Sequence, residues 1–97
     1  MAGSEWTYGI GKSADREISR LPRDLAREAK DTIESLLDDP IPPGSVKLRG
    51  YVNAYRVRFG HERYRILYTV NSHRRHIHVF RVRPRPTAYV KMKNHRY

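Results

Sequence analysis

The sequence predicts an α+β domain in which two N-terminal helices pack on one face of a small antiparallel sheet of four to five strands. Two observations support this prediction. Apolar and polar side chains alternate through residues 54–70, with the two-residue period of β-strands. Apolar residues recur at three- and four-residue spacing through residues 22–37, as in an amphipathic helix. The chain has 97 residues, a length typical of one domain, so we expect residues 1–97 to form a single domain.

The segment 54–70 defines the two faces of the predicted sheet. We expect two strands joined by a turn at residues 60–63. One face receives the apolar side chains of Tyr55, Val57, Phe59, Tyr64, Ile66, Tyr68 and Val70. The other receives Arg56, Arg58 and Arg65, and a one-residue slip of the register would bury all three guanidinium groups. The sequence therefore predicts a sheet with an apolar back and an arginine-lined front, which is a surface suited to phosphate.

The N-terminal part supplies the elements that cover the apolar back. Residues 5–10 alternate like a short strand. Residues 13–20 predict a first helix, with the hydroxyl of Ser13 as its N-cap. Residues 22–37 predict the second helix, and Pro22 suits its first turn because the missing N–H would have no partner there.

The C-terminal part completes the predicted sheet. Residues 45–48 predict a strand that leads into the hairpin. Residues 76–83 predict the last strand, which we place beside residues 64–70 in an antiparallel meander. Residues 87–93 fit one helical turn that carries Tyr89.

Charge is distributed unevenly along the chain. Residues 1–43 hold six Lys or Arg and nine Asp or Glu, whereas residues 44–97 hold fourteen Lys or Arg and one acid, Glu62. The whole chain carries a formal net charge of +10. Because the basic residues fall at strand periodicity beside aromatic residues, the second half is predicted to bind a polyanion such as nucleic acid.

Several classes of function are disfavoured by composition. The chain has no cysteine, so a disulfide framework and a thiolate site are excluded. His73, His76 and His78 lie close in sequence but have no carboxylate or cysteine nearby, so we expect no metal and no cofactor. The sequence shows no apolar run that would span a bilayer and no signal segment at its start, so we expect a cytoplasmic protein without a membrane partner.

Several short motifs occur in a characteristic order. They are the Leu21-Pro22 joint, Pro42-Pro43-Gly44 before Lys47-Leu48-Arg49-Gly50, Tyr55-Arg56-Val57-Arg58, Tyr64-Arg65-Ile66-Leu67-Tyr68, and a final Arg-Pro-Arg followed by a tyrosine. In this order and spacing the chain resembles the RelE/ParE superfamily of bacterial toxins, the toxic halves of toxin–antitoxin pairs. It looks closest to the RelE-type messenger-RNA interferases, and the gyrase-directed ParE branch resembles it less.

The resemblance implies a RelE-like microbial ribonuclease fold and a toxin that cleaves messenger RNA on the ribosome, which inhibits translation. In the family's nucleases the ribose 2′-hydroxyl attacks the adjacent phosphate without a metal ion. Such a reaction needs in-line positioning, charge stabilisation and proton transfer. The implied partners are messenger RNA, the ribosome with its RNA, and a cognate acidic antitoxin.

The resemblance also implies roles for individual residues. The catalytic set that it implies is Arg58, Arg65, Arg83, Arg85 and Tyr89, with either Arg83 or Arg85 as the family's final-strand arginine. The family's basic pair matches Arg56 and Arg58, and our expected RNA-binding set is Lys47, Arg49, Arg56, Arg58 and Arg81. The basic residues Lys47 and Arg49 would contact the RNA backbone, and Tyr51 or Tyr55 would stack on a base. Arg81 has an alternative, structural role in which it pairs with a helix acid such as Glu28 or Glu34.

The sequence departs from the family's pattern in one respect that bears on chemistry. Arginine stays protonated in proteins and cannot serve as a general base. Glu62, the acid of the basic half, lies in a turn, and Tyr89 would need a lowered pKa, which neighbouring guanidinium groups would favour. No general base is therefore identified, which favours a slow or ribosome-assisted nuclease. The alternatives are a ParE-like gyrase-inhibiting toxin and a catalytically weak RNA-binding member of the family.

Overall fold

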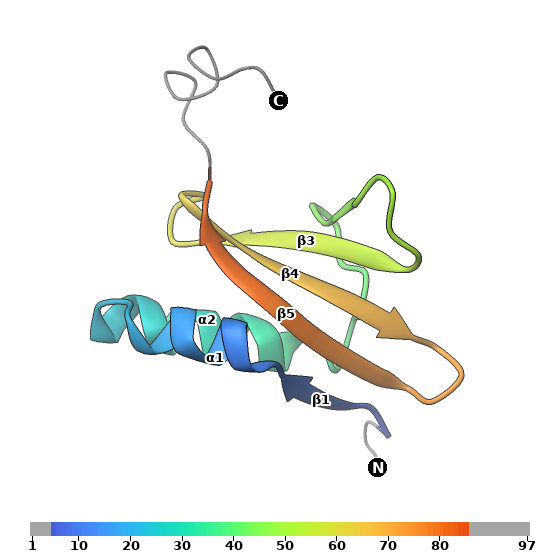
Figure 1. Cartoon of the computed structure of the whole chain (residues 1–97). Helices are drawn as coiled ribbons and strands as arrows, with labels where there is room; N and C mark the ends of the chain where they lie inside the picture. Colours follow the sequence, from blue (N-terminus) through green and yellow to red (C-terminus); the bar gives the residue numbers. More distant parts are fainter. Residues whose placement is uncertain (1–4, 86–97) are drawn as a thin grey trace.

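The computed structural model describes residues 5–85 and shows a five-stranded sheet with two helices on one of its faces (Figure 1). This arrangement confirms the predicted α+β class. The elements, in chain order, are β1 Thr7–Ile10, α1 Lys12–Ser19, α2 Arg23–Ser35, β2 Val46–Lys47, β3 Ala54–Phe59, β4 Tyr64–Asn71 and β5 His76–Pro84. Neither of these helices is long and apolar enough to cross a membrane.

The strands lie in the order β1-β5-β4-β3-β2. The pairs β2–β3, β3–β4 and β4–β5 are antiparallel, as the meander predicts. The pair β1–β5 is parallel, which differs from the expected antiparallel sheet. A parallel pair needs a long connection between its strands, and the two helices and the hairpin supply that connection here.

The core lies between the helices and the apolar back of the sheet. Ala14, Ile18, Ala29, Ile33 and Leu36 come from the helical segment, and the sheet contributes Phe59, Ile66, Tyr68, Val70, Ile77, Val79 and Val82. Tyr55, Val57 and Tyr64 pack against this cluster from its margin. The apolar face predicted from residues 54–70 is therefore confirmed. Each large buried aliphatic side chain stabilises the fold by about 1.5–3 kcal/mol.

Tyr68 brings a hydroxyl into this core. Its ring is fully buried, and the hydroxyl donates a hydrogen bond to the carbonyl of Pro40 at 2.7 Å. Burial, followed by smaller effects of Tyr55 and Asp39, raises the pKa of Tyr68 to about 12 even though Ser45 acts to lower it. The residue is thus a neutral core group that ties the connector after α2 to the sheet.

The helix boundaries differ slightly from the prediction. Helix α1 begins at Lys12, with Gly11 at the N-cap, so Ser13 lies inside the first turn and does not cap the helix. The reason is that Gly11 closes the β1–β5 pairing with an N–H bond to the carbonyl of Val79 at 2.9 Å, and the helix starts immediately afterwards. Helix α2 ends at Ser35, two residues before the predicted residue 37.

A β-bulge in β5 decides which side chains reach the front of the sheet. Leu67 of β4 pairs with Arg81, whereas the next residue, Tyr68, pairs with Val79, so Phe80 is an extra residue. Before the bulge, residues 77 and 79 face the core; after it, residue 82 does. Strict alternation would have placed Arg81 on the same face as Val79. The bulge turns it, and Arg83 after it, to the arginine-lined front.

Candidate nucleic-acid interface

Three arginines form a row across the three central strands. Arg58 of β3 pairs with Arg65 of β4, and Arg65 pairs with Arg83 of β5. Residues that are directly opposite one another in a sheet lie within side-chain contact distance, and like charges there are destabilising. This arginine row therefore opposes folding rather than supporting it. Its charge arrangement is complementary to an anion placed over the centre of the sheet.

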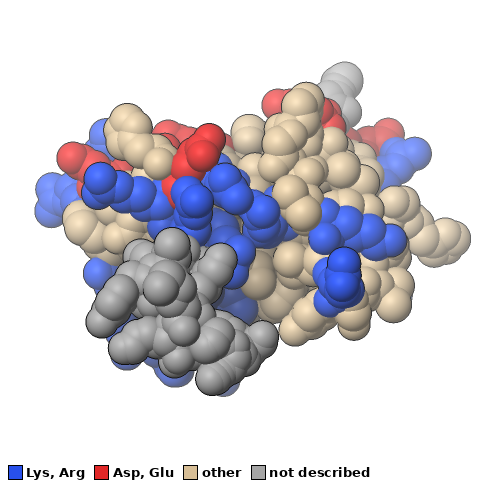
Figure 2. All heavy atoms as spheres, turned by 90° about the horizontal axis from the view of Figure 1, so that it is seen from above, with Lys and Arg blue, Asp and Glu red and all other residues tan. Residues whose placement is uncertain are grey.

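Two further arginines enlarge the row into an arginine cluster of residues 56, 58, 65, 83 and 85. Arg56 lies two residues from Arg58 on the same face of β3. The backbone N–H of Arg85 donates to the carbonyl of Arg63 at 2.7 Å, which extends the pairing of β5 past its last residue. Figure 2, a view from the side opposite the helices, shows Lys and Arg side chains in a band across this face.

The arginines of the cluster perturb one another. Burial and then the charges of Arg58, Arg83 and Arg85 lower the pKa of Arg65. Burial and then the charges of Arg58, Arg65 and Arg85 lower the pKa of Arg56. Arginine still remains charged at neutral pH, because its ordinary pKa is so high. Burial and, to a lesser extent, mutual repulsion therefore disfavour the charged forms of Arg56 and Arg65, and a bound anion would offset both effects.

Two nitrogen atoms of the cluster are left without a partner. Arg56 Nη1 and Arg65 Nε are buried, and neither makes a hydrogen bond to any residue in the described part of the chain. A buried donor that lacks an acceptor is costly, and the cost rises when the group is charged. Arg65 is the middle residue of the arginine row and Arg56 lies beside the row on β3, so this unused donor capacity belongs to the arginine cluster.

Glu62 contacts the cluster from the β3–β4 turn. Its Oε1 lies 3.3 Å from Nη1 of Arg58, and its side chain is 69% exposed. The turn is held in a left-handed conformation, with φ of 66° at Gly60, 56° at His61 and 67° at Glu62. Glu28 of α2 anchors it by accepting the N–H of Gly60 at 2.9 Å. Glu62 is thus a largely free carboxylate on a turn of defined shape.

Glu17 of α1 lies beside β5, near Arg83 of the cluster, and both of its carboxylate oxygens accept hydrogen bonds. Its Oε2 accepts hydrogen bonds from Arg81 Nε at 3.0 Å and Nη2 at 2.8 Å, and its Oε1 accepts the backbone N–H of Val82 at 2.7 Å. Arg83 Nε lies 3.8 Å from the same carboxylate. Burial acts to raise the pKa of Glu17, but these hydrogen bonds and the charges of Arg81 and Arg83 outweigh it and lower the pKa.

The pairing of Arg81 corrects its proposed helix partner. The acid is Glu17 rather than Glu28 or Glu34, and Glu28 binds the hairpin turn instead. Two of the nitrogens of Arg81 are occupied by this pairing. Its role in RNA binding remains a prediction. The structure nevertheless gives Arg81 a closer acidic partner than any residue of the arginine row has, since Arg83 lies 3.8 Å from Glu17 and Arg58 lies 3.3 Å from Glu62.

The other predicted site residues are dispersed. Lys47 pairs with Tyr55, so its side chain leaves the exposed edge strand on the face opposite the arginines. Arg49 is exposed in the loop before β3. Tyr89 lies outside the described residues. Tyr55 packs toward the core beside Tyr68, with ring centroids 6.1 Å apart, so Tyr51 is the tyrosine that remains available on the front.

A front hollow of about 470 Å³ adjoins the arginine row. It is lined by Tyr51, Arg65, Leu67, Phe80, Arg81, Arg83 and Pro84. The rings of Tyr51 and Phe80 stack at its side with centroids 6.0 Å apart and planes 26° apart. The sequence analysis did not identify Phe80 or Leu67 as site residues. The broken alternation of the apolar residues at 77, 79 and 82 was the signal that could have revealed the bulge and therefore Phe80.

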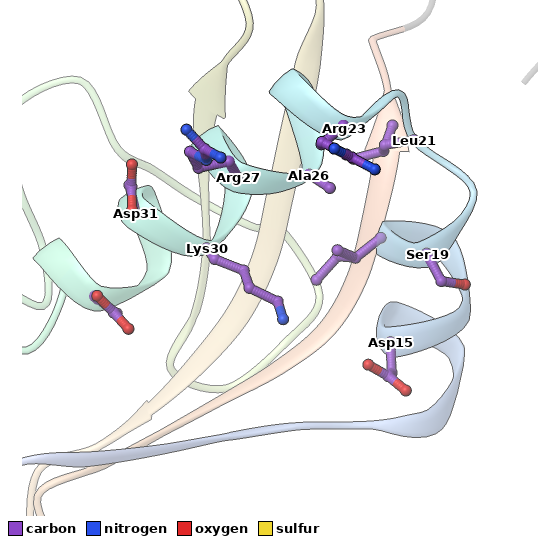
Figure 3. Close-up of a pocket in the computed structure, with 10 residues that line it drawn as sticks. Asp15, Ser19, Leu21, Arg23, Ala26, Arg27, Lys30 and Asp31 are labelled. Atoms are coloured by element: carbon purple, nitrogen blue, oxygen red, sulfur yellow. The ribbon is translucent and has the colours of Figure 1, made fainter.

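A second hollow, the helix groove, has a volume of about 670 Å³ and lies between the two helices (Figure 3). Figure 3 shows Lys30 extending from α2 toward α1, where Asp15 lies. The groove combines apolar residues with both signs of charge; it is lined by Asp15, Ile18, Ser19, Leu21, Arg23, Ala26, Arg27, Lys30, Asp31 and Glu34. This mixed lining suits a polypeptide better than a polyanion.

Within residues 5–85, which the structure describes, no three or more His, Asp or Glu side chains lie close enough together to hold a metal ion. His76, one of the three neighbouring histidines, has Nδ1 2.8 Å from the hydroxyl of Thr7 in the adjacent strand. That contact joins β1 to β5 at the edge of the sheet. The chemistry available at the front is therefore that of guanidinium groups, aromatic rings and the carboxylate of Glu62.

Comparison with solved structures finds the same fold in bacterial and archaeal toxins. The isolated RelE toxin of E. coli superposes with a TM-score of 0.74 at 20% identity, covering 91% of this chain and 93% of that one. RelE in the RelE–RelB complex of Pyrococcus horikoshii OT3 gives 0.71 at 24% identity, covering 89% and 100%. A YoeB/ParE toxin of Agrobacterium tumefaciens gives 0.70 at 16% identity, covering 82% and 99%.

Sequence comparison identifies the family. A search among curated proteins finds no significant match. The family model described as the ParE toxin of type II toxin–antitoxin system, parDE, matches residues 8–89. That match includes both helices, all of the described sheet except the first residue of β1, and the complete arginine cluster. The chain therefore belongs to the ParE toxin family of type II toxin–antitoxin systems, within the RelE/ParE superfamily.

Proposed function

We propose that this toxin is a metal-independent endoribonuclease that cleaves messenger RNA on the ribosome. The arginine row is the observation that carries the proposal. A row of like charges with an unpaired buried donor, Arg65 Nε, is unfavourable in the free protein and becomes favourable when a phosphate lies over it. The in-register pairing of Arg58, Arg65 and Arg83 supports a single phosphate-binding centre rather than a diffuse basic surface.

The proposed reaction is attack of a ribose 2′-hydroxyl on the adjacent phosphate. A cyclic phosphate forms as the bond to the next nucleotide's 5′-oxygen breaks, and that oxygen leaves as a hydroxyl after gaining a proton. Arg65 and Arg83 would bind the phosphate oxygens, whose negative charge increases in the transition state. Arg56 and Arg58 would hold the neighbouring backbone, while Arg85 extends the positive field.

Proton transfer needs a group other than arginine. Glu17 already accepts three hydrogen bonds, so it is committed to holding β5. Glu62 makes one contact of 3.3 Å and is mostly exposed, so among the described carboxylates that touch the cluster it is the one free to take a proton. Its side chain is on a solvent-exposed turn rather than enclosed over the arginine row, which supports a slow nuclease that the ribosome assists. Tyr89 remains the alternative proton carrier.

We also propose a cytoplasmic location and an acidic antitoxin as the cognate partner. Solved structures with this fold include RelBE toxin–antitoxin complexes of E. coli and Mycobacterium tuberculosis. An acidic segment over the arginine cluster would neutralise it, and the helix groove offers a separate surface of mixed charge for an ordered part of the partner.

A gyrase-inhibiting toxin is the second candidate function. It is favoured by the match to the ParE toxin model and by the fold similarity to a YoeB/ParE toxin. In that case the arginine front would bind another macromolecule without cleaving RNA. A third candidate is an RNA-binding family member with little catalysis, in line with a site whose general base is not identified.

One experiment separates these functions. The toxin is induced briefly in growing cells, and messenger-RNA 5′ ends are mapped alongside an assay for DNA breaks. We expect cuts inside reading frames, in phase with codons and dependent on translation. Arg65→Ala should abolish them, whereas Arg74→Ala, which removes an exposed arginine outside the cluster, should not. Intact messages with DNA breaks would indicate gyrase inhibition, and intact messages with RNA binding would indicate the third candidate.

A further inference from the structure

The front hollow has an aromatic wall made of two rings that lie outside the core cluster, Tyr51 and the half-buried Phe80. Tyr51 is 58% exposed, and its stacked partner Phe80 is the extra residue of the bulge in β5. Both rings lie on the front of the sheet, away from the core cluster that the helices cover. Exposed aromatic rings beside a row of cations are the combination that single-stranded nucleic-acid sites use to hold bases and phosphates together.

The loop that carries Tyr51 is anchored at both ends. The N–H of Leu48 donates to the carbonyl of Ala54 at 2.8 Å, and the N–H of Val70 donates to the carbonyl of Asn53 at 2.8 Å. Gly50 and Asn53 adopt positive φ of 84° and 56°, which shapes the loop between these bonds. The ring of Tyr51 is thus presented by a defined loop, so ordering it on binding costs little.

The length of the hollow along the strands fits one nucleotide, because the hollow extends from Arg65 and Arg83 of the arginine row to Leu67 and Arg81. The pair Leu67–Arg81 lies two residues along the strands from the pair Arg65–Arg83, which corresponds to about 6.6 Å. That separation is comparable to the distance between a phosphate and the base of its own nucleotide. Because Arg81 is held by Glu17, it forms a fixed wall of the hollow, and Arg65 and Arg83 remain for the phosphate.

We propose that the front hollow is a nucleobase subsite of single-stranded RNA, in which one base stacks on Tyr51 and Phe80 while its phosphate lies on the arginine row. This proposal rests on the proposed ribonuclease function and specifies how the same face holds its substrate. Stacking faces and the aliphatic side chain of Leu67 offer no pattern of donors and acceptors, so the subsite accepts any base and prefers those that stack well.

The test compares two strands with the same backbone. A short fluorescent 2′-O-methyl oligoribonucleotide, which lacks the attacking hydroxyl, and its abasic counterpart are titrated with the full-length toxin, and binding is followed by anisotropy. Tyr51→Ala should weaken binding of the base-bearing strand about tenfold and leave the abasic strand unchanged. Phe80→Ala should act in the same way, and Tyr51→Phe should retain tight binding. Val52→Ala is the matched control, since Val52 is an 83% exposed neighbour outside the hollow.

The outcomes separate this proposal from the ribonuclease itself. Equal weakening of both strands by Tyr51→Ala, no weakening of either, or no binding by the unmodified toxin would overturn the subsite. If any of these results is found together with cuts in reading frames, the ribonuclease proposal is supported and only the subsite is rejected. Base-dependent binding that requires Tyr51 in a toxin that makes no cuts would support the subsite and reject the nuclease. Tyr51 lies on the surface, so its variants keep the test valid even where Phe80→Ala disturbs the sheet.

Discussion

Replacing Glu17 with glutamine removes the charge that ties α1 to the outer edge of β5. Strand β1 pairs only with residues 76–79 of β5, so the edge beyond Val79 has no strand beside it among the described residues. The carboxylate of Glu17 takes that place by accepting the N–H of Val82 at 2.7 Å and holding Arg81. In the glutamine variant, one of these two positions receives an amide NH₂ group, which cannot accept a hydrogen bond.

The magnitude follows from these contacts. The side chain of Glu17 is 20% exposed and that of Arg81 is 39% exposed, so solvent weakens the ion pair but does not remove its effect. Hydrogen bonds to charged groups contribute about 1.5–3 kcal/mol, and after allowance for this exposure we expect Glu17→Gln to cost about 2 kcal/mol. For a domain of this size, that corresponds to a melting temperature about 10 °C lower.

The assay is urea unfolding with thermal melting as a second measurement. Glu34→Gln is the matched control, because Glu34 is an exposed acid on α2 with no ion pair among the described contacts, and it should change stability by less than about 0.5 kcal/mol. If Glu17→Gln is as stable as the control, the carboxylate does not hold the edge of β5 and the reasoning fails. A loss much above 4 kcal/mol would show that solvent screening was overestimated.

Four further predictions test the same structure. Folding lowers the pKa of Glu17 from its ordinary value of 4.5, so the stability that its carboxylate contributes is present above about pH 4.5 and lost as pH falls through the folded pKa. Lowering the pH should therefore reduce the free energy of unfolding of the wild type more than that of Glu17→Gln. Parallel plots of this free energy against pH would contradict the prediction. Arg65→Ala should abolish growth inhibition without lowering the melting temperature, since it relieves repulsion; a large loss of stability would point to a structural role. Gly60→Ala should destabilise the folded protein by about 1–3 kcal/mol in thermal melts, because φ at residue 60 is 66° and a Cβ there would lie 3.0 Å from Leu25 Cδ2. A variant that keeps the wild-type melting temperature would contradict this prediction. Glu62→Gln should slow cleavage by about tenfold or more at an unchanged melting temperature, and an unaltered rate would leave the proton acceptor to another group.

The local patterns of the sequence determined the elements and the two faces of the hairpin. Alternation through residues 54–70 placed Phe59, Ile66 and Tyr68 in the core and Arg58 and Arg65 on the front, as the structure confirms. This succeeded because a strand repeats every two residues and a register slip would bury charge. Helix boundaries were less well determined, since the start of α1 depends on where its preceding strand stops pairing, and that is a long-range property.

Only the tertiary structure decided how the site is assembled. The bulge at Phe80 brings Arg83 into register with Arg65 and turns Arg81 toward Glu17, a partner 64 residues away in the chain. It also creates the aromatic wall of the front hollow. Sequence periodicity describes neighbours along one strand, whereas the pairing register, the bulge and the contact between a helix and a sheet edge depend on energies summed over distant segments. The arginines were therefore predictable as a set, but their row, their acidic anchor and the hollow beside them were not.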